Sequence, residues 1–162
     1  MKKRQLKNLT RLIILKTNNH TSKEKKLVIN SRTENLSLIR EFVQENALAA
    51  GMKSKSINDM MLAVDEACTN IIKHAYKSYP DGEIILTIKI FPEKIIIKIK
   101  DYGNAFHPEV IPEPDIQEYY RQKRVGGLGM YLMKTLMDEV KYISIPGKYN
   151  QVMLTKNLNS AN

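Results

Sequence analysis

The sequence predicts an α+β fold, a two-layer α/β sandwich in which a mixed, mainly antiparallel sheet carries helices on one face. Two stretches, 34–50 and 56–77, place apolar residues at intervals of three and four, which is the period of a helix. Two later stretches, 84–90 and 95–99, alternate along the chain as strands with one buried face do. Helices and a hairpin in this order favour helices layered on a sheet.

In the first half of the chain, a short strand is expected at 27–29, directly before the first helix. That helix covers 34–50 and is followed by Gly51, a residue that ends helices well. The second helix covers 56–77. The turn-forming sequence at 80–82 then separates it from the hairpin.

In the second half, residues 102–125 follow neither period, and three prolines prevent a long helix at their start. Residues 115–121 can form only a turn or two of helix. A third helix is expected at 128–138, followed by strands near 140–145 and 152–156. A long connection without regular structure is typical of a functional lid or a disordered segment.

Length and charge suggest one domain with a basic tail. The 162 residues suit a single compact domain at 27–162. Residues 1–26 hold nine of the 26 Lys and Arg residues and one of the 17 acidic residues, so this segment carries +8 of the net charge of +9. We expect a flexible, solvated N-terminal tail, with attraction to nucleic acid or a membrane surface as the alternative. We do not expect the domain to bind nucleic acid directly.

The chain contains one cysteine, Cys68, so it forms no intrachain disulfide. The apolar runs are far shorter than the roughly 20 residues that span a bilayer. The apolar stretch 12–15 is also shorter than the core of a secretory signal peptide. These features predict a cytoplasmic protein without a membrane span.

The second predicted helix carries the first set of candidate site residues. Glu66 and Asn70 are four residues apart and share a face, which Lys73 and His74 extend by one turn. A carboxylate beside an amide oxygen suits a general base next to a magnesium ligand, because Mg²⁺ prefers oxygen donors. The alternative is a solvated polar face.

Asp101 continues the odd-numbered series Ile95, Ile97 and Ile99, so its carboxylate falls at the end of the buried face of its strand. A buried carboxylate needs a hydrogen-bond donor, and the amino group of adenine is one. Gly103 lets the backbone approach a flat ring closely. The alternative is a simple Asp/Gly turn.

Three glycines, Gly126, Gly127 and Gly129, lie where the long connection becomes the third helix. Exposed backbone amides and the positive end of a helix bind phosphate oxygens. Arg121 and Arg124 add positive charge nearby. The spacing matches neither a Walker loop nor a dinucleotide fingerprint, and its alternative is a flexible hinge.

Together, the segments 64–76, 101–106 and 127–133 resemble the N, G1 and G2 boxes of the Bergerat-fold, or GHKL, ATPases. The sequences of these motifs resemble even more closely those of the anti-sigma factor serine/threonine kinases of bacteria, and the similarity covers about residues 27–156. The resemblance implies the Bergerat ATP-binding fold, with ATP and Mg²⁺ as ligands and residues 104–126 as a lid. One departure is the pair Asn150-Gln151, which stands where the family usually carries Gly-Thr.

The resemblance also implies a role for each matched residue. Glu66 is the catalytic base, Asn70 is the Mg²⁺ ligand, and Asp101 with Gly103 forms the adenine site. The other residues expected to bind the nucleotide are Lys73, His74, Phe106, Arg124, Gly126, Gly127, Leu128, Gly129 and Met130.

The implied function is an ATP-dependent serine/threonine kinase that phosphorylates an anti-anti-sigma protein and sequesters a sigma factor, as a homodimer. The alternative is a regulatory module of the same fold that binds ATP and transfers phosphate slowly or not at all. A histidine kinase fragment is a third possibility. However, the basic tail is too short and too charged to supply the helical hairpin that carries a phosphoacceptor histidine.

Overall fold

The computed structural model describes residues 11–13, 22–77, 79, 81–105, 114–122 and 128–159. The elements follow one another as β1 (Arg11–Ile13), β2 (Lys23–Asn30), the 3₁₀ turn η1 (Thr33–Asn35), α1 (Leu36–Ala49), α2 (Ser54–Asn70), the π-helical turn η2 (Ile71–Ala75), β3 (Glu83–Ile90), β4 (Lys94–Asp101), α3 (Ile116–Arg121), α4 (Gly129–Leu136), β5 (Glu139–Ile145) and β6 (Tyr149–Asn157).

The strands form one sheet in the order β1-β2-β3-β4-β6-β5. Every pairing in the described sheet is antiparallel, so the parallel component implied by a mixed sheet is absent from this part of the chain. In the register, Asp101 of β4 stands opposite Ile84 of β3 on one side and Asn150 of β6 on the other. The last residue of β4 is therefore enclosed between two strands.

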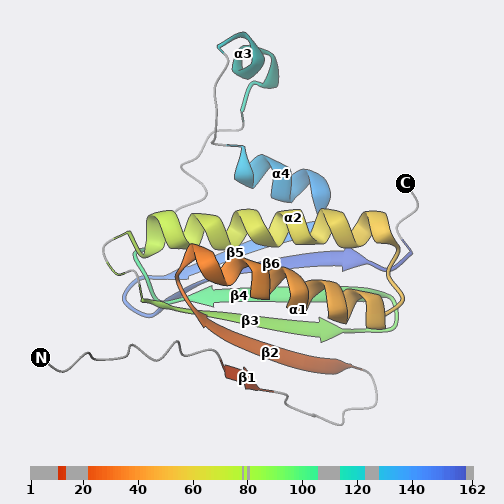
Figure 1. The fold of residues 1–162 in the computed structure, drawn as a ribbon. Coiled ribbons are helices and arrows are strands. Elements are labelled where there is room, and N and C mark those ends of the chain that lie inside the picture. Colours follow the sequence, from red (N-terminus) through yellow and green to blue (C-terminus); the bar gives the residue numbers. More distant parts are fainter. Residues whose placement is uncertain are drawn as a thin grey trace, which may run out of the picture.

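The described helices all lie on one face of the sheet, which confirms the predicted two-layer fold (Figure 1). The alternating strand residues that face the helices are buried, including Ile84, Leu86, Ile97 and Ile99. They pack against the apolar side of α1 and α2, where Ile39 and Met60 are fully buried. Residues of α2 that flank this stripe consequently stand at the rim of the core.

The sheet extends further toward the N-terminus than the sequence predicts. β2 begins at Lys23 rather than Leu27, because residues 23–30 pair along the whole length of β3. Lys89 and Glu24 add an ion pair of 2.9 Å between these strands. The short strand β1, also within the predicted tail segment, pairs with β2. Residues 1–10 and 14–21 of that segment lie outside the described residues.

The ends of α1, α2 and α4 differ from the sequence prediction. α1 covers Leu36–Ala49 rather than 34–50, because residues 33–35 form the 3₁₀ turn η1. α2 begins two residues early, at Ser54, and its α-helical part ends at Asn70 instead of continuing to Lys77. α4 covers 129–136 rather than 128–138. α3 falls within the expected short helix at 115–121. Among the described helices, none has both the length and the apolar character needed to cross a membrane.

Candidate functional site

Glu66 and Asn70 lie side by side at the C-terminal end of α2, as the sequence predicts. Their neighbours Ala67 and Cys68 are buried against the sheet, while Glu66 and Asn70 are half-buried. Because residues four apart occupy the same face of a helix, the carboxylate and the amide point in a common direction. They face the beginning of α4.

Gly129, the first residue of α4, makes the closest approach to this pair. A Cβ atom added at Gly129 would lie 2.6 Å from Oε2 of Glu66 and 3.3 Å from Nδ2 of Asn70. No residue with a side chain fits here unless Glu66 moves. The N-terminal end of α4 therefore packs directly on the predicted base and metal ligand, with the positive end of its dipole beside the carboxylate.

α2 continues into a π-helical turn, a correction to the predicted α-helix. The amide of Tyr76 donates to the carbonyl of Ile71 at 3.1 Å, five residues back. The Ala75 carbonyl is drawn toward the end of β4, where it accepts a 2.8 Å hydrogen bond from the amide of Asn104. Such single π turns occur frequently at functional sites.

Gly103 explains why the chain passes so close to this turn. A Cβ atom at Gly103 would lie 2.4 Å from the carbonyl oxygen of Ala75, which is backbone and cannot give way. The close backbone approach predicted for Gly103 is present, although here the neighbour is the end of the helix. The turn and the end of β4 thus form one connected wall.

Asp101 is buried at the end of β4, with 3% of its surface exposed. Its Oδ1 accepts hydrogen bonds of 2.9 Å from the amide of Gly103 and from Nδ2 of Asn150. Burial raises the pKa of Asp101, and these two hydrogen bonds act in the opposite direction. Asp101 therefore lies on the buried face of β4, as the alternation along the strand predicts, and its carboxylate points between the sheet and the helices.

A cavity of about 80 Å³, partly open to solvent, lies at the end of α2. Its lining is largely apolar, as is typical of small-molecule sites. Three predicted residues line it: Asn70, His74 and Asp101. The other lining residues come from the end of α2, the chain after β4 and the last hairpin: Ala67, Ile71, Ala75, Asn104, Ala105, Met133, Tyr142, Ile143, Ser144, Asn150, Gln151 and Val152.

The family of histidine kinase-like ATPase domains matches residues 29–156. The chain belongs to this family. Its described structure also resembles the crystal structure of the RsbU and RsbW domains of a Mycobacterium tuberculosis protein, with a TM-score of 0.60 and 14% identity over 83% of this chain and 32% of that one. At that identity the likeness concerns the fold alone.

Curated relatives place the chain more narrowly, among the RsbW-type serine-protein kinases. It is 36% identical to the serine-protein kinase RsbW of Listeria monocytogenes over 137 residues, which cover 82% of this chain and 86% of the relative. It is 34% identical to the serine-protein kinase RsbW of Bacillus subtilis, over 81% of this chain and 83% of that protein.

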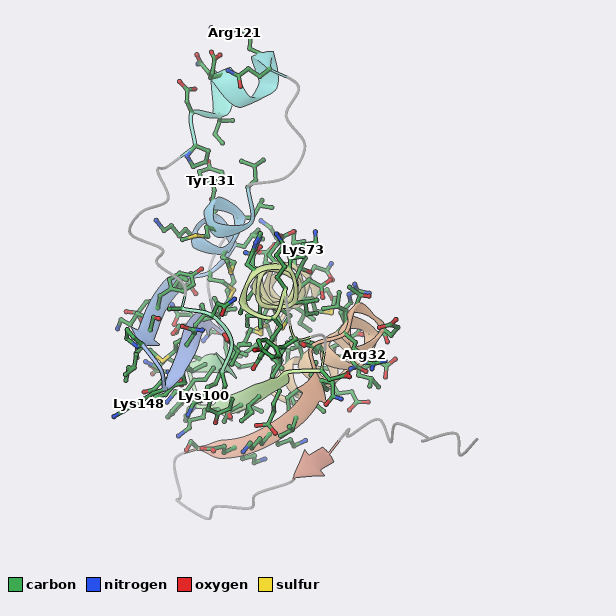
Figure 2. The ribbon with its side chains drawn as sticks, turned by 90° about the vertical axis from the view of Figure 1, so that its left-hand side faces the viewer. Arg32, Lys73, Lys100, Arg121, Tyr131 and Lys148 are labelled. Carbon is green, nitrogen blue, oxygen red and sulfur yellow. The ribbon has the colours of Figure 1, made fainter. Side chains whose placement is uncertain are left out.

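Some predicted residues of this ATPase-type site lie elsewhere or outside the described part. Lys73 is exposed on η2, on the side that faces away from the sheet (Figure 2), and does not line the cavity. Leu128 immediately precedes α4, and Met130 packs against the core. The remaining predicted residues are outside the described residues: Phe106, Arg124, Gly126 and Gly127.

A resident metal would depend on few protein ligands. Among the described residues, no group of three or more His, Cys, Asp or Glu side chains is placed to hold a metal ion. Asn70 lines the cavity, and its side-chain amide makes no hydrogen bond to another described residue. This fits Mg²⁺, which uses one or two protein oxygens together with substrate phosphates and water.

Sequence reasoning missed the cavity residues Tyr142 and Ser144 of the last hairpin, and it noted Asn150 only as a departure from the family pattern. Asn150 shares its even-numbered face with the buried residues Val152 and Leu154, which is the same alternation that identified Asp101. Burial also raises the pKa of Tyr142 to about 12. A search along buried strand faces for polar residues would have marked Asn150 as a site residue.

Proposed function

We propose that this chain is an ATP-dependent protein serine kinase that acts as an anti-sigma factor. The observation that carries the proposal is the approach of Gly129 to both Glu66 and Asn70, since Asn70 lines the same cavity as Asp101. A base, an oxygen ligand for a metal and a helix N-terminus are adjacent there. Phosphoryl transfer relies on such positioning and on charge stabilisation.

The roles follow from chemistry and location. Asp101 accepts a hydrogen bond from the amino group of adenine. Phosphate oxygens bind near the start of α4, at residues 126–130, with Arg124 and His74 supplying further donors and Phe106 contributing to the nucleotide site. Asn70, together with the phosphates, would hold Mg²⁺, which would offset the charge of the transferred phosphoryl group. Glu66 takes the proton of the acceptor hydroxyl as the hydroxyl oxygen attacks the γ-phosphorus, and the bond between that phosphorus and the β-phosphate oxygen breaks to release ADP.

The acceptor is a serine or threonine of an anti-anti-sigma protein, and the regulated partner is a sigma factor. We propose that the kinase works as a homodimer in the cytoplasm. The relatives named serine-protein kinase RsbW support the reaction class. The family match over residues 29–156 includes every residue that lines the cavity.

The decisive experiment follows transfer of the γ-phosphoryl group to purified candidate anti-anti-sigma proteins, together with calorimetric binding of Mg·ATP. Glu66→Gln is expected to retain ATP binding and to lose roughly 10²- to 10⁴-fold in transfer rate, the usual contribution of a general base. Glu45→Gln, an exposed carboxylate on α1, is the matched control and should behave as wild type.

An unchanged rate of phosphoryl transfer in Glu66→Gln would show that Glu66 is not the catalytic base. Binding of ATP by the wild type without any phosphorylated product would instead identify a regulatory ATP-binding module. Absence of ATP binding would contradict the proposed function as a whole.

A further inference from the structure

Asn150 is a buried polar residue in the lining of the cavity. It lies on β6, has 7% of its surface exposed, and stands directly opposite Asp101 in the sheet register. A buried amide is costly unless its donors and acceptor are all satisfied. Its hydrogen bonds therefore indicate what it holds in place.

The Asn150 amide connects three parts of the cavity wall. Its Nδ2 donates to Oδ1 of Asp101 at 2.9 Å and to the carbonyl of Asn104 at 3.0 Å. Its Oδ1 accepts a 2.7 Å hydrogen bond from the hydroxyl of Ser144 on β5. Because the carboxylate and the carbonyl only accept, the amide nitrogen must face them, and the orientation of the side chain is fixed.

This arrangement occupies one oxygen of Asp101 and leaves the other for a ligand. Oδ1 receives both the Asn150 amide and the Gly103 backbone amide, at 2.9 Å each. Two donors on one oxygen fix the plane of the carboxylate group. The described hydrogen bonds of this side chain all fall on Oδ1, so Oδ2 is the acceptor that remains for the amino group of adenine.

We propose that Asn150, supported by Ser144, is a positioning residue for ATP that fixes the carboxylate of Asp101 and ties it to the chain leaving β4 at Asn104. This inference rests on the proposed function, since it assumes that adenine occupies the cavity. It assigns a role to the position where the sequence departs from its family. The Asn150 amide supplies two donors, and a threonine hydroxyl introduced at this position would supply one.

The first test is the dissociation constant of Mg·ATP for Asn150→Ala and Asn150→Thr, measured by calorimetry. Loss of a hydrogen bond to a charged group predicts roughly 10-fold weaker binding for Asn150→Ala. Asn150→Thr retains one donor and should recover part of the loss. Asn46→Ala removes an asparagine that is equally buried, on α1 and far along the chain from the cavity, and should leave the affinity unchanged.

The second test is the pH dependence of that affinity. The Asn150 hydrogen bond lowers the pKa of Asp101, so its removal raises that pKa. If ATP binding requires the ionised Asp101 carboxylate, acidification should abolish binding at a higher pH in Asn150→Ala than in wild type. Other titratable groups near Asp101 are His74 and Tyr142 in the cavity and Tyr76 beside β4. All variants retain these groups, so the shift relative to wild type reports on Asp101.

The inference is supported if Asn150→Ala binds ATP more weakly, shifts the pH midpoint upward and is partly rescued by threonine. It is overturned if affinity and midpoint match wild type, or if affinity falls equally at every pH with no rescue. Should Asn150→Ala fail to fold, Ser144→Ala decides, with an expected 2- to 5-fold loss and a shift in the same direction. Failure of the wild type to bind ATP would instead contradict the proposed function itself.

Discussion

The ammonium group of Lys156 donates a 2.7 Å hydrogen bond to the main-chain carbonyl of Leu136, the last residue of α4. Lys156 is 4% exposed and also lies 3.6 Å from a carboxylate oxygen of Asp59 on α2. A cation at a helix C-terminus satisfies an unpaired carbonyl and complements the helix dipole. α4 is thus held at both ends, by Lys156 and by the contact of Gly129 with Glu66.

Replacing this buried cation is expected to loosen α4. Lys156→Met leaves the Leu136 carbonyl unpaired, which costs about 2 kcal/mol of unfolding free energy and lowers Tm by roughly 4–8 °C in a domain of this size. Lys148→Met makes the same change at an exposed turn (Figure 2) and should leave Tm within about 1 °C of wild type, since surface substitutions have small effects. Thermal unfolding followed by circular dichroism makes the comparison. Equal Tm values for both variants would contradict the structural role of Lys156.

Gly129→Ala is expected to impair catalysis more than folding. The added methyl group would meet Oε2 of Glu66 at 2.6 Å, and the flexible carboxylate can move away while the backbone stays in place. Displacing the base should lower the rate of phosphoryl transfer at least about 10-fold, because catalysis is sensitive to shifts of this size. Thr135→Ala, on the exposed side of the same helix, is the control. A variant with a normal rate would mean that Glu66 acts from another position.

Asp101→Asn is expected to separate stability from ATP binding. The asparagine carbonyl can keep both hydrogen bonds made by Oδ1, but the second oxygen is replaced by a donor. Loss of the acceptor for the adenine amino group predicts roughly 10- to 100-fold weaker ATP binding in calorimetry.

The same variant predicts a pH-dependent gain in stability. Burial raises the pKa of Asp101, so the folded state binds its proton more tightly than the unfolded state does. Wild type therefore loses stability relative to Asp101→Asn as the pH rises from about 4, the ordinary aspartate pKa, through the raised folded value. The Tm difference between variant and wild type should be larger at pH 8 than at pH 5. A difference that is constant with pH would show that Asp101 carries no desolvation penalty.

Asn70→Ala is expected to raise the Mg²⁺ concentration required for half-maximal phosphoryl transfer. The variant removes the amide oxygen that lines the cavity next to Glu66. Asn70→Asp keeps an oxygen ligand and should require less Mg²⁺ than the alanine variant, while Asn58→Ala, exposed on α2, should match wild type. Titration of Mg²⁺ at fixed ATP distinguishes these variants. An identical requirement in all of them would place the metal away from Asn70.

The fold and half of the cavity could be predicted because they depend on local periodicity. The three-and-four spacing fixes which side of α2 is buried and hence the direction of Glu66 and Asn70. The alternation of β4 does the same for Asp101. Neither inference needs knowledge of what lies across the core.

The remainder depends on contacts between distant segments. The π-helical turn forms where Ala75 meets Asn104, and no property of residues 71–75 alone specifies it. The role of Asn150 requires the pairing of β6 with β4, which brings it opposite Asp101. The early start of β2 follows from its partner β3, because cross-strand pairing outweighs the weak strand propensity of lysine.

The position of β5 at the border of the sheet has a consequence for the cavity. Among the described strands, β5 pairs only with β6, yet it supplies Tyr142 and Ser144 to the cavity wall. Edge strands open more readily than central strands, so their amide hydrogens exchange with solvent sooner. A nucleotide that bridges this wall and α2 would slow exchange in β5 while β3, at the middle of the sheet, stays unaffected. Binding of a nucleotide would thus be detectable as slower amide hydrogen exchange in the edge strand β5.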